Sequence, residues 1–132
     1  MTRATDPTRP TRNAAVGASG ERIAAHLLER DGYRILTRNW RCPGGELDLV
    51  ALSGETLVGV EVRVRTGVAH GSAAESVVGA KARRTLAAMA AYLAAYPEHA
   101  DRLVRVDVIA ITLDRAGRVV ETLHLEDALA EG

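Results

Sequence analysis

Aromatic side chains are scarce in this chain of 132 residues, which has three Tyr, one Trp and no Phe. The core must therefore be built from Ala, Val, Leu and Ile. We do not expect the aromatic platform on which RNA-binding and single-strand-binding proteins stack bases. The only cysteine, Cys42, excludes an internal disulfide and a cage of thiolate ligands around a metal.

Long apolar runs are also missing. No segment approaches the length that spans a membrane, and the N-terminus lacks the apolar stretch of a signal peptide. We therefore expect a cytoplasmic protein with no membrane partner. Apolar residues make up 47% of the chain, as in globular proteins, and the length suits a single domain with one core.

The net charge is zero, but the charged residues are segregated along the chain. Residues 1–42 carry eight Arg against four acids, and residues 43–62 carry four acids and no base. Residues 63–105 are basic again, and residues 106–132 are acidic. A short acidic segment between basic ones could seat metal ions inside a rim that attracts phosphate. Ordinary surface charge in blocks explains the distribution equally well, so it permits nucleic-acid binding without requiring it.

Hydrophobic periodicity predicts one domain at residues 14–132 after a disordered basic tail at residues 1–13, which are mainly Thr, Arg and Pro. Helices are expected at 14–31 and 78–96, and strands at 33–41, 46–52, 56–65, 102–113 and 118–123. The first helix should bury Ile23, Leu27 and Leu28, and the second should bury Leu86, Met89, Ala90 and Leu93.

Short turns between the first three strands favour an antiparallel meander, with a loop at 66–78 before the second helix. That helix then connects the third strand to the fourth, which favours a parallel arrangement of these two strands. The sequence therefore predicts an α/β fold with a mixed sheet flanked by helices, in the order α-β-β-β-α-β-β.

The strand at 56–65 carries the most information about function. Side chains alternate between the two faces of a strand, so the valines at 58, 60, 62 and 64 form one core-facing row. Glu61 and Arg63 lie on the opposite face. If this strand forms a hairpin with the preceding one, Asp48 and Glu61 can lie next to each other.

Two carboxylates on neighbouring strands destabilise the pairing unless something neutralises them. A divalent cation such as Mg²⁺ or Mn²⁺ would do so, because these ions prefer oxygen ligands. Alternatively, Arg63 and Arg65 neutralise Asp48 and Glu61 in a surface network of ordinary ion pairs.

Asp48 followed by Glu61-Val62-Arg63 resembles the D…(D/E)-x-K signature of the PD-(D/E)XK nucleases. Four segments are similar in order and spacing to the YraN family of uncharacterised bacterial proteins: Gly17-x-x-Gly20-Glu21 opening a helix, Gly45-Glu46-Leu47-Asp48-Leu49, Val60-Glu61-Val62-Arg63, and the helix start with Lys81. That family in turn resembles archaeal Holliday junction resolvases. The resemblance covers about residues 14–126. It implies a restriction-endonuclease-like core, a Mg²⁺ site and hydrolysis of DNA phosphodiester bonds.

The resemblance also implies roles for individual residues. Asp48, Glu61 and the backbone carbonyl of Val62 would bind the ion, which would activate a water molecule for in-line attack. Glu21 matches an acidic residue on a helix of the resolvases. In those proteins the acid either completes the metal site or is linked to it as a relay. A Glu in the first turns of a helix is equally explained by its favourable interaction with the helix dipole.

Arg63 departs from the pattern, which has lysine at this position. Arg supplies positive charge and hydrogen-bond donors but cannot lose its proton to act as a base. The chain has 16 Arg and one Lys, so replacement of Lys by Arg fits its composition. The lone lysine, Lys81, falls where the resemblance expects one and is a candidate catalytic residue, although an exposed helix lysine needs no special explanation.

Three functions remain open at this point. The first is a metal-dependent DNA endonuclease, for which branched DNA is one candidate substrate. The second is a nuclease fold impaired by Arg63 that only binds DNA, and the third is a protein-interaction module. Arg65, Arg83 and Arg84 are candidate phosphate contacts, or simply part of a solvated surface. A homodimer is implied by the resemblance alone, and a buried Asp107 is expected to form a structural salt bridge.

Overall fold

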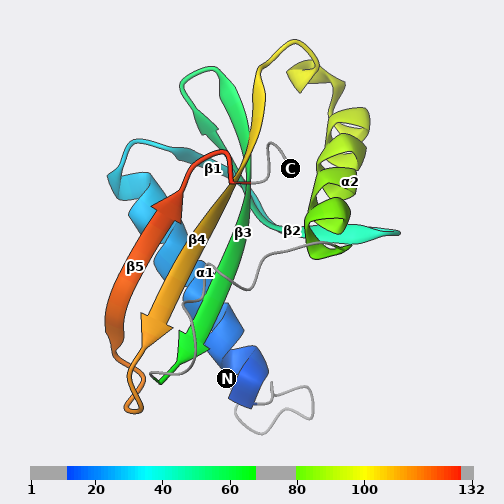
Figure 1. Ribbon diagram of the computed structural model, residues 1–132. Helices are drawn as coiled ribbons and strands as arrows, with labels where there is room; N and C mark the ends of the chain where they lie inside the picture. The colour runs from blue at the N-terminus through cyan, green and yellow to red at the C-terminus, as the bar shows by residue number, and fades with distance from the viewer. Residues whose placement is uncertain (1–11, 68–79, 129–132) are drawn as a thin grey trace, which may run out of the picture.

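The computed structural model describes residues 12–67 and 80–128 (Figure 1). The elements follow one another as α1 (Arg12–Arg30), β1 (Arg34–Cys42), β2 (Gly45–Ser53), β3 (Thr56–Thr66), α2 (Ala80–Ala95), the short 3₁₀ helix η3 (Pro97–His99), β4 (Val104–Leu113) and β5 (Val119–Leu125). The predicted tail up to residue 11 and the loop from residue 68 lie outside the described residues.

All five strands belong to one sheet, in which their spatial order equals their order in the chain. β1, β2 and β3 form the expected antiparallel meander. β4 pairs with β3 in parallel after the α2 crossover, and β5 returns antiparallel to β4. The predicted α/β fold with a mixed sheet flanked by helices is therefore confirmed, including the order of its elements.

The first helix begins earlier than its apolar periodicity indicated. Arg12 and Asn13, which the sequence assigned to the tail, are helical. The Gly17-x-x-Gly20-Glu21 segment therefore lies inside α1 and does not open it. A Cβ atom at Gly20 would collide with the side chain of Val64, so the glycine allows α1 to lie close against β3.

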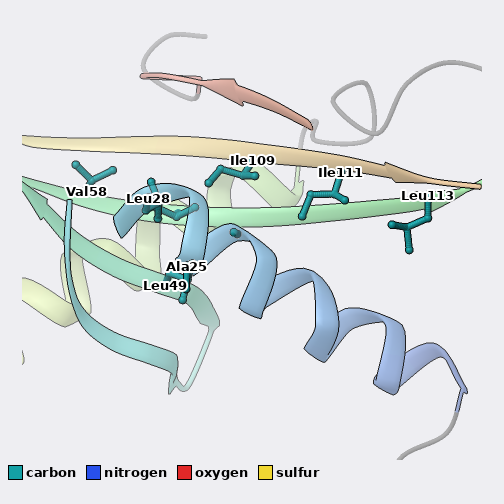
Figure 2. Close-up of a cluster of buried hydrophobic side chains, with 9 residues drawn as sticks. Ala25, Leu28, Leu49, Val58, Ile109, Ile111 and Leu113 are labelled. Atoms are coloured by element: carbon teal, nitrogen blue, oxygen red, sulfur yellow. The ribbon is translucent and has the colours of Figure 1, made fainter. Parts of the chain in front are cut away.

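α1 packs on one face of the sheet (Figure 2). Its fully buried residues are Ala24, Ala25 and Leu28, whereas the predicted Ile23 and Leu27 are partly buried at the edges of this contact. Small alanines at the centre allow the helix to approach the sheet closely. The sheet contributes Leu49, Val58, Val60, Ile109, Ile111 and Leu113 to the same cluster.

α2 covers the other face but is rotated from its predicted orientation. Leu86 is 45% exposed and Ala90 is exposed, so the stripe predicted from apolar spacing is wrong at these two positions. The buried positions are Thr85, Ala88, Met89 and Tyr92. Tyr92 can be buried because its hydroxyl pairs with Thr37 Oγ1 at 2.9 Å. A count of apolar residues misses such a side chain, whose body is apolar and whose tip is polar.

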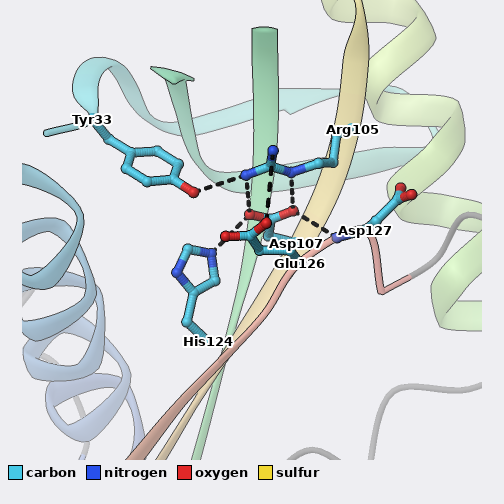
Figure 3. Close-up of polar contacts among 6 residues, drawn as sticks. All are labelled: Tyr33, Arg105, Asp107, His124, Glu126 and Asp127. Atoms are coloured by element: carbon cyan, nitrogen blue, oxygen red, sulfur yellow. Dashed lines mark hydrogen bonds and ion pairs between the residues drawn. The ribbon is translucent and has the colours of Figure 1, made fainter. Parts of the chain in front are cut away.

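A buried ion-pair network joins β4, β5 and Tyr33, the residue just before β1 (Figure 3). Asp107 is fully buried, and Arg105 donates to both of its carboxylate oxygens, at 2.8 and 3.0 Å. His124 Nε2 lies 2.7 Å from the same carboxylate, and the backbone N–H of Asp127 donates to it at 2.9 Å. Arg105 also donates to the hydroxyl of Tyr33 at 2.8 Å. The predicted structural salt bridge of Asp107 is confirmed.

Candidate active site

The candidate site begins where β2 and β3 separate. Their ladder ends at the pair Leu49–Val60. One residue further along each strand stand Asp48 and Glu61. There Oδ2 of Asp48 accepts a hydrogen bond of 2.7 Å from the backbone N–H of Val62. The side chain of Asp48 is thus held against β3 at the end of the ladder.

Glu61 and Arg63 lie on the α2 face of β3, opposite the valine row that packs against α1. The side chain of Glu61 is 5% exposed and that of Arg63 is 22% exposed. Nη2 of Arg63 lies 3.2 Å from Oε2 of Glu61. The Nε atom of Arg63 is buried and has no hydrogen-bond partner within the described part of the chain. The guanidinium therefore neutralises Glu61 while keeping one donor unused.

Asp48 is in a different electrostatic state. Burial, and then the negative charge of nearby Glu61, raise its pKa from 3.8 to about 7, against the lowering effect of the Val62 N–H. No Arg or Lys of the described residues forms an ion pair with Asp48. The alternative in which arginines neutralise both acids therefore holds for Glu61 through Arg63, but it does not hold for Asp48.

Glu21 reaches the same region from α1. Its Oε1 accepts a hydrogen bond of 3.0 Å from Nδ2 of Asn39. Burial raises the pKa of Glu21, and the charge of Glu21 in turn contributes to the raised pKa of Asp48. The two acids are therefore electrostatically coupled. The described residues contain no group of three or more His, Cys, Asp or Glu that could hold one ion, so Glu21 does not complete a three-ligand group with Asp48 and Glu61.

Sequence reasoning missed Asn39, whose side chain holds that of Glu21. It lies opposite Asp48 in the β1–β2 pairing, between the pairs Arg38–Leu49 and Trp40–Leu47. Its φ of 52° is left-handed, a conformation that Asn tolerates better than most residues. The only sequence signal was an Asn in a predicted strand, where this residue is disfavoured.

A pocket of about 350 Å³ adjoins Glu61, between the β1–β2 hairpin and the start of α2. Its lining residues are Arg41, Cys42, Gly45, Glu46, Glu61, Arg84 and Thr85. Of the predicted phosphate contacts, Arg84 thus lies on the pocket wall, whereas Arg83 and Arg65 are exposed elsewhere. Lys81 is in the first turn of α2, but its side chain lies outside the described part of the structure.

Comparison with known proteins assigns the chain to a family. A family model described as "Uncharacterised protein family UPF0102" matches residues 20–111, the segment that holds Glu21, Asp48, Glu61 and Arg84. The chain belongs to this family. The resemblance to the YraN family found in the sequence is thereby confirmed. No helix of the described part of this UPF0102 chain is long and apolar enough to cross a membrane.

Individual UPF0102 proteins match most of the chain. One from Beutenbergia cavernae is 50% identical over 103 residues, which cover 78% of this chain and 86% of the relative. One from Frankia casuarinae is 50% identical over 105 residues, covering 80% and 88%. One from Roseiflexus castenholzii is 42% identical over 120 residues, covering 91% and 97%. These relatives support the same family assignment over up to 91% of the chain.

Proposed function

We propose that this UPF0102 protein is a metal-dependent endonuclease that hydrolyses phosphodiester bonds in DNA. The observation that supports this function most is the pairing of two largely buried carboxylates, Asp48 and Glu61, of which only Glu61 has a cationic partner among the described residues. A raised pKa caused by burial and by a like charge is typical of functional sites. A structural role would be served better by a neutral pair.

The donors present suit a hard divalent cation. Carboxylate oxygens of Asp48 and Glu61, together with the carbonyl of Val62, form an oxygen-only set of the kind that Mg²⁺ and Mn²⁺ prefer. Such an ion, when bound, supplies charge stabilisation to a scissile phosphate and lowers the pKa of bound water. A cation would also remove the repulsion that raises the pKa of Asp48.

The other residues would position and neutralise the substrate. The guanidinium of Arg63, whose side chain is 22% exposed, would donate to a phosphate oxygen. Arg84 faces the pocket beside Glu61 and would contact a neighbouring phosphate, with Arg65, Arg83 and Lys81 as further candidate contacts. Glu21, held by Asn39, would tune Asp48 through its charge without ligating the ion. Contacts of this kind favour largely sequence-independent, salt-sensitive binding, including binding to branched DNA.

One observation favours a second candidate, a protein that binds DNA without cleaving it. Arg63 already engages an oxygen of Glu61 at 3.2 Å, so its guanidinium competes with a cation for that oxygen. Arg also cannot release its proton to act as a base. In this second function, the site is a binding surface with reduced or no hydrolysis.

Cleavage of linear and branched DNA by the purified protein, in Mg²⁺, Mn²⁺ or EDTA, tests the proposal. We expect cleavage with either metal, none in EDTA, and none with Asp48→Asn. Glu121→Gln, which neutralises an exposed acid on β5, is the matched control and should retain activity. Loss of cleavage in Glu121→Gln as well, or cleavage that persists in EDTA, would contradict a metal site at Asp48.

Arg63 decides between the two candidate functions. In an active nuclease Arg63→Lys keeps the charge and should retain or raise the cleavage rate, whereas Arg63→Ala should lower it about a hundredfold, the usual cost of one electrostatic donor. In a protein that only binds DNA, Arg63→Ala should weaken the affinity for DNA by about the contribution of one phosphate contact. It should produce no difference in cleavage rate from the wild type. Cleavage rates measured beside equilibrium DNA binding separate these outcomes.

A further inference from the structure

The pocket beside Glu61 has the size of a small-ligand site but walls of an unusual kind. Its volume of about 350 Å³ falls within the range of about 300–1,000 Å³ that is common for ligand pockets. Glu61 and Thr85 are buried and form its floor. The exposed residues at its mouth are Arg41, Glu46 and Arg84. Walls of this kind suit a polar ligand that carries both hydrogen-bond donors and acceptors.

The mouth of the pocket presents a donor next to an acceptor. Nε of Arg41 on β1 lies 3.3 Å from Oε1 of Glu46 on β2, and the two residues are directly opposite in the strand ladder. Their side chains are 75% and 51% exposed, so guanidinium nitrogens and carboxylate oxygens remain accessible to a ligand. Every nucleobase carries donors and acceptors side by side on its Watson–Crick edge, which is accessible only in an unpaired base.

Arg84 adds a cation on the opposite wall, which belongs to α2. A guanidinium can bind a phosphate oxygen or stack on the face of a base. The pocket also shares Glu61 with the candidate metal site. A strand whose phosphate lies at that site therefore has its next nucleotide beside the pocket. A base that is stacked and paired inside a duplex cannot enter such a cavity, because it must first leave the stack.

We propose that this pocket receives an unpaired nucleotide of a DNA strand, next to the phosphate that is cleaved. The Watson–Crick edge of its base meets Arg41 and Glu46, and Arg84 holds its phosphate. This inference rests on the proposed function, because it takes the strand to pass Asp48 and Glu61. It makes the protein selective for DNA with an unpaired nucleotide, such as a bulge or a flap. The base sequence is not read, since every base offers donors and acceptors on that edge.

Equilibrium binding in EDTA at low ionic strength tests the pocket separately from cleavage. The probes are a short DNA duplex with one unpaired 2-aminopurine, and the same duplex with 2-aminopurine opposite thymine. We expect the bulged duplex to bind at least about tenfold more tightly, because a base of the paired duplex must first lose its pairing and stacking. The fluorescence of the unpaired 2-aminopurine should rise on binding, because stacking on neighbouring bases quenches it.

Two variants of the pocket should abolish this preference. Glu46→Ala removes the acceptor and should bring the ratio of the two affinities close to one. The ratio is the readout, because loss of a negative charge strengthens the binding of both duplexes. Cys42→Phe, which fills the pocket with a larger side chain, should have the same effect on the ratio, and circular dichroism checks its fold. Glu121→Ala, which removes an exposed acid from β5, is the matched control and should leave the ratio unchanged.

The outcomes separate this inference from the proposed function. Equal affinities of the wild type for the two duplexes, or a ratio that Glu46→Ala leaves unchanged, would overturn the pocket's role. Cleavage of paired DNA in Mg²⁺ would then still support the nuclease. A preference for the bulged duplex without cleavage in Mg²⁺ or Mn²⁺ would support the pocket and contradict the nuclease.

Discussion

At the scale of the residue, Asp48 shows how position changes chemistry. An aspartate whose pKa lies near 7 is largely protonated in mildly acidic solution, whereas an ordinary aspartate is ionised there. The cause is local: burial, the nearby Glu61 and the absence of an ion-pair partner among the described residues. A cation bound beside Asp48 would reverse this preference by favouring the ionised form.

This leads to a prediction about stability and pH. The folded state raises the pKa of Asp48 from 3.8 to about 7, so the contribution of its protonated form is complete below about pH 4 and is lost as pH rises through 7. Asp48→Asn is neutral at every pH and keeps an oxygen that can accept from Val62. Above pH 7 it should therefore be more stable than the wild type, by on the order of 1–4 kcal/mol.

Urea denaturation of both proteins at pH 5 and pH 8, without divalent cations, measures this difference. The stability gap should shrink toward pH 5. If the proposed ion binds the wild type alone, the gap should also narrow at pH 8 when Mg²⁺ is added. A gap that stays constant with pH would contradict the raised pKa.

At the scale of the element, the pocket exists because the β1–β2 hairpin lies directly against α2. A Cβ atom at Gly45 would stand 2.5 Å from the backbone oxygen of Arg84 and 3.2 Å from Cβ of Ala88. Gly45 therefore sets the distance between the two elements that carry Arg41 and Arg84. A Cβ atom at Gly59 would stand 2.7 Å from Sδ of Met89, but this flexible side chain can move aside, so Gly59 constrains α2 less than Gly45 does.

Gly45→Ala should destabilise the protein by about 1–3 kcal/mol, because the backbone of α2 must move to accept the methyl group. Ser53→Ala, at the other end of β2, is the control and should change stability by less than about 0.5 kcal/mol. Thermal denaturation measures both effects. A neutral Gly45→Ala would show that the hairpin is free to move away from α2.

At the scale of the whole molecule, the network around Asp107 fastens the C-terminal strand to the rest of the sheet. Burial alone would raise the pKa of Asp107, but hydrogen bonds from Arg105, Asp127 and His124 outweigh it and hold the pKa below its ordinary value. The network lies on the α1 face, opposite Glu61, and is a structural feature separate from the candidate site.

Asp107→Ala should lower the free energy of unfolding by about 3–5 kcal/mol, because it leaves Arg105 without its main partner. Glu126→Gln, which alters only an exposed acid 4.0 Å from Arg105, should cost less than about 1 kcal/mol. The contribution of Asp107 is present above its ordinary pKa of 3.8 and is lost as pH falls through the lower folded value. Urea denaturation between pH 2 and 7 measures both the loss of stability in each variant and the pH dependence of the Asp107 contribution. Equal losses in the two variants would contradict the assigned role.

The sequence by itself determined the order of elements, the strand directions and the two faces of β3. These features follow from local periodicity, turn residues and the handedness of a crossover, which the chain encodes within short windows. Val58 and Val60 face α1, and Glu61 and Arg63 lie on the opposite face of β3, as alternation predicted. The proximity of Asp48 and Glu61 also followed from the sequence, because the turn of a tight hairpin sets the register of its two strands.

The tertiary structure alone decided the rotation of α2, the role of Asn39 and the partners of Asp107. Burial of Tyr92 depends on Thr37, 55 positions away in the chain, so no local apolar count could place the helix correctly. Asn39 acts through Glu21 on another element. The exposed Leu86 and the raised pKa of Asp48 likewise arise from packing between distant segments. So does the Nε of Arg63, which is buried without a hydrogen-bond partner among the described residues. Contacts and burial of this kind depend on the assembled fold, and local pattern does not contain them.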